Sequence, residues 1–342
     1  MNNNNSVSVV DEVLKIFNNN WNRQVILYGP PGTSKTYSAV EIAAKLLAGK
    51  YGENSKDGKA PAEWDHDDCK GYLSGKSDRY KVVQFHPSYS YEDFVRGIKV
   101  EVKQGEQLPT YSVERKILEE FCKGMEKDEN EYRVLVIDEI NRAPLASVLG
   151  ELIYGLEYRG EAIYTPYTLT DKNDQSTDKQ GEPIPLVVPK NLYIIGTMNT
   201  ADRSIGSMDY AVRRRFAFVE VPSCKDAIAG SWGKVKGFGE RVEEFYTKLM
   251  EEAFATDLMT DGDEEVANDI KIGHTYFLGN DQIKDENDAK EYFTYRVKYQ
   301  ILPIYKEYVK DGLIKESGLE AFKKVLNSFE GLIDIQKILP DR

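Results

Sequence analysis

The sequence predicts an α/β fold, with a parallel sheet in a larger domain and only helices in a smaller one that follows. Three observations lead to this prediction. Short apolar runs alternate with helical patterns up to Pro222, and a glycine-rich loop at residues 29–36 joins the first run to its helix. Beyond Pro222 the apolar residues keep helical spacing only. We therefore expect domains at residues 22–222 and 223–342, after an N-terminal tail and short helix at 1–21.

The first elements open the sheet. Residues 7–19 place apolar side chains at helical spacing, which predicts a short amphipathic helix before the first strand. Residues 24–28 form an apolar run that ends at a glycine, as a buried strand does. Residues 35–48 carry one apolar helical face. A strand, a glycine-rich loop and a helix in this order are typical of a parallel α/β sheet.

Four more strands and several helices complete the prediction. The strands are expected at residues 81–85, 133–137, 191–198 and 216–221. One helix is expected after the third strand, and its core-facing residues would be Leu145, Val148, Leu149, Leu152 and Leu156. The smaller domain is expected to contain helices at 239–254, 289–311 and 318–328.

Two polar tracts interrupt these elements. Residues 51–79 are rich in Gly, Lys and Asp, which indicates a surface insertion. Residues 169–183 form a polar tract between two strand-like runs, which predicts a protruding hairpin or loop.

The bulk composition excludes several classes of protein. The 342 residues are 41% hydrophobic and 30% charged, without an apolar run long enough for a transmembrane helix. No signal peptide opens the chain, and three widely separated cysteines lack metal-ligand spacing, so we expect a reduced, cytoplasmic protein with no membrane partner. A net charge of -12 argues against non-specific DNA binding by this chain alone.

A phosphate-binding loop is predicted next. Its expected ligand-binding residues are Gly29, Pro30, Pro31, Gly32, Thr33, Ser34, Lys35, Thr36 and Tyr37. A triphosphate requires inward backbone N–H groups, a helix N-terminus, a lysine for the β and γ oxygens and a hydroxyl for Mg²⁺. Lys35 and Thr36 match the last two roles. Ser34 stands where such loops usually have glycine, and we expect serine to fit because backbone angles open to non-glycine residues are accessible at the helix start.

An acidic pair follows the third expected strand. Asp138 and Glu139 come directly after the strand expected at 133–137, in which residues 134–137 are apolar. Because ligands bind beyond the carboxyl ends of parallel strands, we expect Asp138 to hold Mg²⁺ with Thr36. Glu139 would polarise the attacking water. The alternative is a strand that merely ends in solvated acids.

Four longer motifs follow one another along the chain: residues 137–143 (Ile-Asp-Glu-Ile-Asn-Arg-Ala), 198–204 (Met-Asn-Thr-Ala-Asp-Arg-Ser), 209–216 (Asp-Tyr-Ala-Val-Arg-Arg-Arg-Phe) and 272–277 (Ile-Gly-His-Thr-Tyr-Phe). They resemble the McrB family, the GTP-hydrolysing AAA+ subunits of modification-dependent restriction enzymes. The resemblance covers roughly residues 22–310, and several long motifs occur in order. It is far more specific than the Gly-Pro-Pro-Gly segment alone.

The resemblance implies an AAA+ P-loop nucleoside-triphosphatase, with an α/β domain and a smaller helical lid. It also implies GTP as substrate, Mg²⁺, a hexameric ring with nucleotide between subunits, and a separately encoded McrC-like nuclease partner. About twenty residues precede the first expected strand, too few for a DNA-reading domain. We therefore expect DNA to be contacted through another subunit or a longer parent chain, if at all.

The same resemblance makes Asn199 the first sensor, an amide that orients water near the γ-phosphate. Asp202 and Arg203 are expected to position that water or to contact a neighbouring subunit, although Asp202 could simply cap a turn. Residues 199–202 superficially match the guanine reader of small GTPases. We reject that role, because the loop faces phosphate in this fold.

Three consecutive arginines form the densest positive cluster of the chain. At a ring interface, guanidinium groups can reach a neighbour's γ-phosphate. We expect Arg214 and Arg215 to act in this way and Arg213 to be structural. A solvated basic turn is the alternative.

Two other functions compete with a GTP-driven motor. One is a MoxR-like ATPase that remodels proteins, and the other is a non-catalytic scaffold that binds nucleotide. The motif at 198–204 favours the motor, and intact Lys35, Asp138, Glu139 and Asn199 argue against the scaffold. The choice of GTP over ATP rests on the resemblance alone.

Overall fold

The computed structural model describes residues 8–55, 57–102, 108–167, 169–170, 183–202, 208–260 and 262–339. By its internal contacts the chain divides into two compact units. The first contains the segments up to Tyr28, Thr36–Met198 and Asp202–Val219. The second contains Gly29–Lys35, Asn199–Ala201 and Glu220–Arg342, so the phosphate loop groups with the helical part rather than with the sheet.

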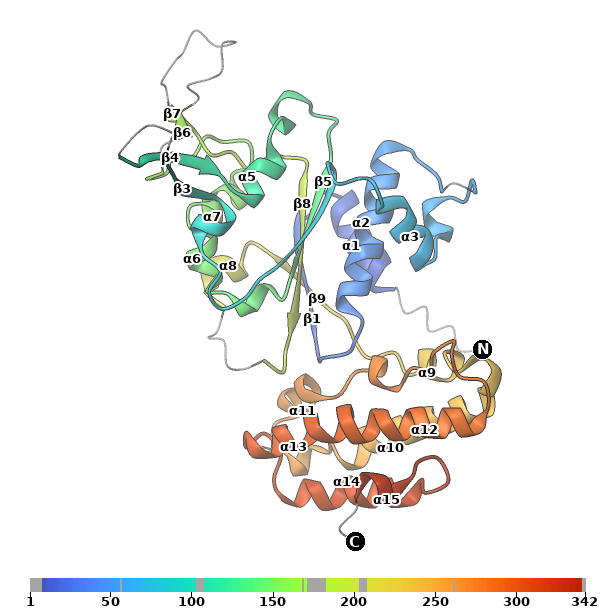
Figure 1. Ribbon diagram of the computed structural model, residues 1–342. Coiled ribbons are helices and arrows are strands. Elements are labelled where there is room, and N and C mark those ends of the chain that lie inside the picture. Colours follow the sequence, from blue (N-terminus) through green and yellow to red (C-terminus); the bar gives the residue numbers. More distant parts are fainter. Residues whose placement is uncertain are drawn as a thin grey trace. The chain divides into compact units, whose positions relative to one another are not determined.

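A five-stranded sheet forms the centre of the first unit (Figure 1). Its strands are β1 (Gln24–Gly29), β2 (Tyr80–Gln84), β5 (Arg133–Asp138), β8 (Leu192–Asn199) and β9 (Ala217–Glu220), in the order β2-β5-β8-β1-β9. The register of β5 with both β2 and β8 is parallel. Val25, Ile26 and Leu27 of β1 are fully buried, as expected for a parallel strand covered on both faces. The five strands predicted from the sequence are these five.

Helices cover the sheet on two sides (Figure 1). They are α1 (Val9–Asn18), α2 (Lys35–Tyr51) and α3 (His66–Leu73) on one side, and α5 (Ile117–Cys122), α6 (Leu145–Leu149), α7 (Leu152–Glu157) and α8 (Tyr210–Arg213) on the other. Ser8 caps α1 by accepting a hydrogen bond from the Asp11 N–H, and Val13 and Phe17 of that helix are fully buried.

The prediction of a single helix after β5 is wrong. A 3-10 turn (Ile140–Arg142) leads into α6, and Gly150 separates α6 from α7. Gly150 has φ +49°, and a Cβ at this position would lie 2.9 Å from the Tyr91 ring. The chain therefore turns where the apolar periodicity runs on unbroken.

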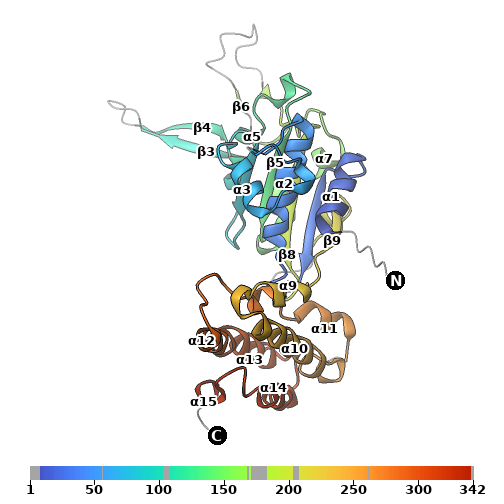
Figure 2. The same cartoon turned by 90° about the vertical axis from the view of Figure 1, so that its right-hand side faces the viewer.

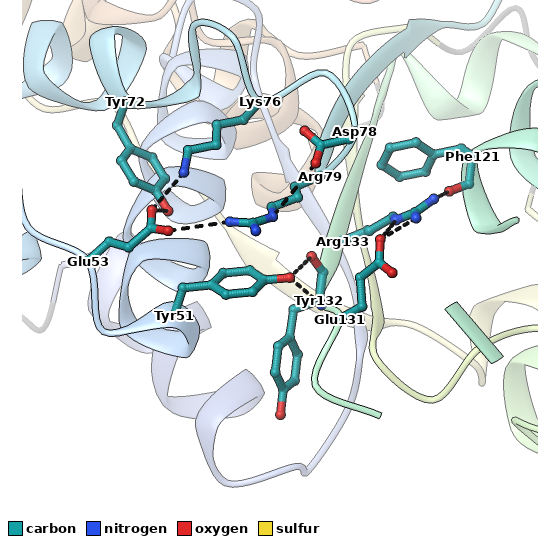
Figure 3. Close-up of polar contacts among 10 residues, drawn as sticks. All are labelled: Tyr51, Glu53, Tyr72, Lys76, Asp78, Arg79, Phe121, Glu131, Tyr132 and Arg133. Carbon is teal, nitrogen blue, oxygen red and sulfur yellow. Dashed lines mark hydrogen bonds and ion pairs between the residues drawn. The ribbon is translucent and has the colours of Figure 1, made fainter. Parts of the chain in front are cut away.

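The insertion at 51–79 is folded and anchored rather than loose. It contains a 3-10 turn (Pro61–Glu63) and α3. Figure 3 shows Glu53 accepting a hydrogen bond from Lys76 (2.7 Å), while the Tyr51 hydroxyl accepts from the Tyr132 N–H (2.8 Å) just before β5. The Tyr51 contact attaches the start of the insertion to the body of the first unit, and the Glu53–Lys76 contact holds the two ends of the insertion together.

Two hairpins accompany the sheet. Strands β6 (Leu169–Thr170) and β7 (Pro183–Ile184) pair antiparallel, which confirms the base of the predicted hairpin, while residues 171–182 lie outside the described residues. Strands β3 (Arg96–Glu101) and β4 (Thr110–Arg115) form a second hairpin that extends from the body (Figure 2). The short helix α4 (Tyr91–Phe94) precedes it. Sequence analysis did not predict this second hairpin.

The larger part of the second unit is helical. Its helices are α9 (Asp226–Gly230), α10 (Lys236–Glu252), α11 (Glu264–Ile270), α12 (Glu286–Arg296), α13 (Leu302–Lys310), α14 (Ser317–Ser328) and α15 (Ile335–Ile338), with a π-helical turn at Val297–Ile301 between α12 and α13. The three predicted helices correspond to α10, to α12 with α13, and to α14. Phe245, Phe277 and Phe293 are fully buried in their shared core. Within the described ranges, no helix has the length and apolar character needed to cross a bilayer.

Candidate nucleotide site

The acidic pair lies in a group of hydrogen-bonded side chains at the carboxyl end of the sheet. We call Thr36, Asp138, Glu139 and Thr197 the sheet-edge group. Asp138 Oδ1 accepts hydrogen bonds from the hydroxyls of Thr36 (2.8 Å) and Thr197 (2.7 Å). Thr197 Oγ1 in turn accepts from the backbone N–H of Glu139 (3.1 Å). The two residues expected to hold the metal are thus in direct contact.

Thr197 was missed by the sequence analysis. It is 2% exposed and lies on β8, next to β5 in the sheet. A polar residue in the apolar run 192–198 was the available signal, but it could not reveal that the hydroxyl faces Asp138.

Glu139 occupies a strained backbone position at the end of β5. Its φ is +54°, in the left-handed region, and the chain turns there into the 3-10 helix. Arg142 Nε lies 3.6 Å from Glu139 Oε2, and Arg142 Nη2 lies 3.4 Å from Asp202 Oδ2. Arg142 therefore bridges two residues that were expected to act in catalysis. Strain of this kind is common at functional sites, where the surrounding structure holds it.

The phosphate loop folds tightly around its lysine. The Lys35 ammonium donates to the carbonyl oxygens of Gly29 (2.9 Å) and Pro30 (2.7 Å), and the residue is only 7% exposed. The Thr33 hydroxyl donates to the same Pro30 carbonyl (3.1 Å). The carbonyls of the first loop residues thus point toward the lysine.

The segment at residues 273–275 lies against the loop within the second unit. The N–H of Gly273 donates to the Pro31 carbonyl (2.8 Å), and the N–H of Thr275 donates to the Gly32 carbonyl (3.0 Å). Gly32 has φ +80°, and a Cβ there would lie 2.5 Å from the Tyr276 ring. The loop therefore needs glycine both for its conformation and for this close approach.

The expected reason for tolerating Ser34 is wrong. Helix α2 begins at Lys35, and Ser34 has φ +67°. The residue before the lysine thus needs the left-handed conformation that usually calls for glycine, and a serine adopts it here.

Asn199 is the last residue of β8, and the chain after it also contacts the phosphate loop. The N–H of Thr200 donates to the Gly29 carbonyl (3.1 Å), and its hydroxyl donates to the Asp269 carbonyl (2.7 Å). Arg203, expected to act with Asp202, lies outside the described residues.

Known proteins similar to this chain include one domain family and two restriction-enzyme components. Residues 71–216 match the family described as "AAA domain (dynein-related subfamily)". The chain is 30% identical over 307 residues to the type IV methyl-directed restriction enzyme EcoKMcrB subunit of Escherichia coli strain K12, covering 86% of this chain and 55% of that protein. It is 27% identical over 219 residues to the type II restriction enzyme BsuMI component YdiS of Bacillus subtilis strain 168, covering 61% of this chain and 60% of that one.

The chain is a McrB-like AAA+ protein. It spans little more than half the length of the two curated relatives, 55% and 60%. The α/β fold with a parallel sheet and a helical C-terminal part, predicted from the sequence, is confirmed for this McrB-like chain.

The three arginines of the McrB-like chain differ in their surroundings. Arg213 and Arg214 are exposed, and the Arg213 guanidinium lies 5.2 Å from the Phe218 ring centroid. The Arg215 side chain is 9% exposed, forms an ion pair with Glu157, and donates to the Ala211 carbonyl (3.2 Å). Arg214 is therefore better placed than Arg215 to contact another subunit.

Tyr37, which follows the loop, stacks on His66 of α3. The ring centroids are 3.4 Å apart and the planes differ by 9°. Burial raises the pKa of the Tyr37 hydroxyl and lowers the pKa of His66, so both rings are neutral at pH 7. The Tyr37 side chain is thus engaged with the insertion at 51–79.

The donor set of the sheet-edge group fits magnesium. Mg²⁺ prefers oxygen ligands and takes only one or two from protein when phosphates supply others. Thr36 and Asp138 offer a hydroxyl and a carboxylate in contact. Among the residues that the structure describes, no cluster of three or more His, Cys, Asp or Glu side chains could hold a metal by itself.

Proposed function

We propose that this chain is the GTP-hydrolysing motor of a restriction system, assembled as a hexameric ring that drives a McrC-like nuclease. The observation that carries the proposal is the sheet-edge group: two hydroxyls on Asp138, next to Glu139 in a strained turn. Such a set, with a lysine-bearing phosphate loop directly before Thr36, suits phosphoryl transfer to water. The similarity to EcoKMcrB, named as a methyl-directed restriction enzyme subunit, supports the biological role. The choice of GTP follows from the resemblance of the sequence motifs to the McrB family.

Each residue has a distinct proposed role. The backbone N–H groups of residues 32–34 and the Lys35 ammonium bind the β and γ oxygens of the nucleotide. Thr36 and Asp138 hold Mg²⁺, which neutralises charge that develops on the phosphates. Glu139 accepts a proton from the attacking water, and Asn199 orients that water.

Two further roles concern the neighbours of these residues. Arg142, between Glu139 and Asp202, bridges the two carboxylates and fixes their orientation. Arg214, exposed on its own subunit, reaches the nucleotide of the next subunit in the ring. A site completed by a neighbour would hydrolyse GTP only after assembly.

A nuclease partner is proposed because this chain supplies nucleotide hydrolysis and another protein would supply DNA cleavage. Each candidate catalytic residue found so far belongs to the nucleotide site, so cleavage of DNA requires a second protein. Hydrolysis by this chain alone should be slow, and the nuclease partner should stimulate it several-fold. DNA is contacted through the complex, in the cytoplasm where modified or foreign DNA arrives.

The test compares steady-state hydrolysis of GTP and of ATP, with gel filtration in the presence of each nucleotide. We expect a ring and turnover with GTP, and a further increase when the co-purified partner is added. Asn199→Ala should lose most of the stimulated rate and keep nucleotide binding. Preference for ATP without a nuclease partner would favour the MoxR-like function instead.

A further inference from the structure

Ser34 carries a conformational cost that a glycine would not. Its φ of +67° places a residue with a Cβ in the left-handed region, directly before the phosphate-binding lysine. Left-handed backbone is unfavourable for residues other than glycine, because the Cβ comes too close to the following carbonyl oxygen. Something in the surrounding structure must offset this cost if the loop is to hold its shape.

The contact that offsets it comes from the segment 240 positions away in the chain. Ser34 Oγ lies 3.1 Å from His274 Nε2. The imidazole is 6% exposed, and burial lowers its pKa, so the ring is neutral. This is the only side-chain hydrogen bond of Ser34 among those the described residues form.

The other side of the imidazole determines which nitrogen carries the proton. His274 Nδ1 accepts a hydrogen bond from the N–H of Cys224 (3.1 Å) and therefore has no proton of its own. The proton is then on Nε2, which donates to Ser34 Oγ. Hydrogen bonds at both ring nitrogens, to Cys224 and to Ser34, thus fix the imidazole. The backbone N–H of His274 also donates to Ser223 Oγ (2.9 Å).

We propose that His274 is a positioning residue that holds Ser34 in the left-handed conformation and so ties the helical unit to the shape of the phosphate loop. The conformation of Ser34 sets the direction of the N–H groups at the start of α2, which receive phosphate oxygens. His274 also holds residues 223 and 224, just after β9. Any shift of that segment therefore changes the affinity of the loop for a triphosphate. The inference rests on the proposed function only in taking the loop to bind nucleotide.

Two substitutions separate the two hydrogen bonds of the imidazole. In His274→Asn the amide oxygen can take the place of Nδ1, which keeps the Cys224 bond and removes the bond to Ser34. In His274→Gln the amide nitrogen can take the place of Nε2, which restores the donor to Ser34. Ser34→Gly removes both the strain and the need for the bond.

The experiment measures the Kd of fluorescent GTP and ATP analogues for the wild type, for Ser34→Gly and His274→Asn singly and combined, and for His274→Gln. We expect His274→Asn alone to weaken binding about tenfold, about 1.4 kcal/mol. His274→Gln should recover most of this loss. When Ser34→Gly is already present, adding His274→Asn should change the Kd less than about twofold. An equal loss with and without Ser34→Gly, or no loss in either case, would overturn the proposal.

Urea unfolding of the same variants without nucleotide separates this idea from the proposed function. The effects of Ser34→Gly and His274→Asn on the free energy of unfolding should also be non-additive, because the hydrogen bond between Ser34 and His274 exists in the unliganded chain. If the wild-type chain bound neither nucleotide, the proposed function would fail, while the unfolding cycle would still decide whether His274 supports Ser34. Additive effects in that cycle would make His274 a merely structural residue.

Discussion

The sheet-edge group and the phosphate loop are consecutive in the chain at Lys35 and Thr36, yet they are supported in different ways. The polar side chains at the sheet edge are held by neighbouring strands, with Thr197 of β8 between Asp138 and the Glu139 N–H. The loop is held by residues 273–275 of the helical unit, through backbone hydrogen bonds and the His274 ring. Changes in the helical unit should therefore alter nucleotide affinity, whereas changes in the sheet should alter turnover.

The largest expected effect is at the lysine of the loop. Lys35→Ala removes the cation that faces the β and γ oxygens and should abolish triphosphate binding. Titration with a fluorescent nucleotide measures this directly, and circular dichroism checks that the variant is folded. Unchanged affinity would show that the loop is not the phosphate site, and the comparison with the sheet edge would lose its basis.

Substitutions at Arg214 and Arg215 test whether a neighbouring subunit contributes an arginine to the nucleotide site. Arg214→Ala should bind nucleotide and fold normally but hydrolyse about 10³-fold more slowly, as for other arginine fingers. Arg215→Ala removes the pair with half-exposed Glu157 and should lower the free energy of unfolding by about 1 kcal/mol.

Subunit mixing tests whether Arg214 acts on a neighbour. Arg214→Ala subunits have an intact loop, and Lys35→Ala subunits have an intact arginine, so mixed rings should regain part of the activity. No recovery at any ratio would count against action between subunits. Normal stability and slow turnover in Arg215→Ala would return the finger role to Arg215.

Glu139→Gln separates binding from turnover within the sheet-edge group. The amide keeps the shape of the side chain and loses the charge that accepts a proton from water. Turnover should fall about 10²–10⁴-fold, while nucleotide affinity and ring assembly are retained. Single-turnover hydrolysis and gel filtration give the two readouts, and turnover at the wild-type rate would assign proton transfer to another residue.

Among the substitutions expected to slow turnover, Thr197→Val should have the smallest effect. It tests support within the sheet-edge group, as the His274 variants test support of the phosphate loop. Valine has nearly the same shape but leaves Asp138 and the Glu139 N–H without this hydroxyl. Loss of such a partner costs about 1–3 kcal/mol, so we expect kcat to fall about tenfold or more with a smaller change in Kd. Thr197→Ser keeps the hydroxyl and serves as the control. A loss of affinity without a loss of turnover would contradict the distinction between the two groups.

The positions of the strands, the loop and the acidic pair could be predicted because each depends on nearby residues. Residues 134–137 are apolar enough to be a buried strand wherever they are placed, and Asp138 and Glu139 must follow at its end. The helices of the C-terminal part follow from the spacing of their own apolar residues. The break at Gly150 was not predicted, because the apolar periodicity continues through it, and the close approach of Tyr91 from another segment is visible only in the structure.

The sequence by itself thus determined the fold class and the residue types that phosphate and magnesium require, since both follow from local pattern and order along the chain. Tertiary structure alone decided how those residues are supported. Thr197 lies 59 positions from Asp138, and His274 lies 240 positions from Ser34. The tertiary structure also places the Arg215 side chain, 9% exposed, against Glu157 and leaves Arg214 exposed. Pairings at such separations arise only when distant segments pack together, and no local periodicity encodes them.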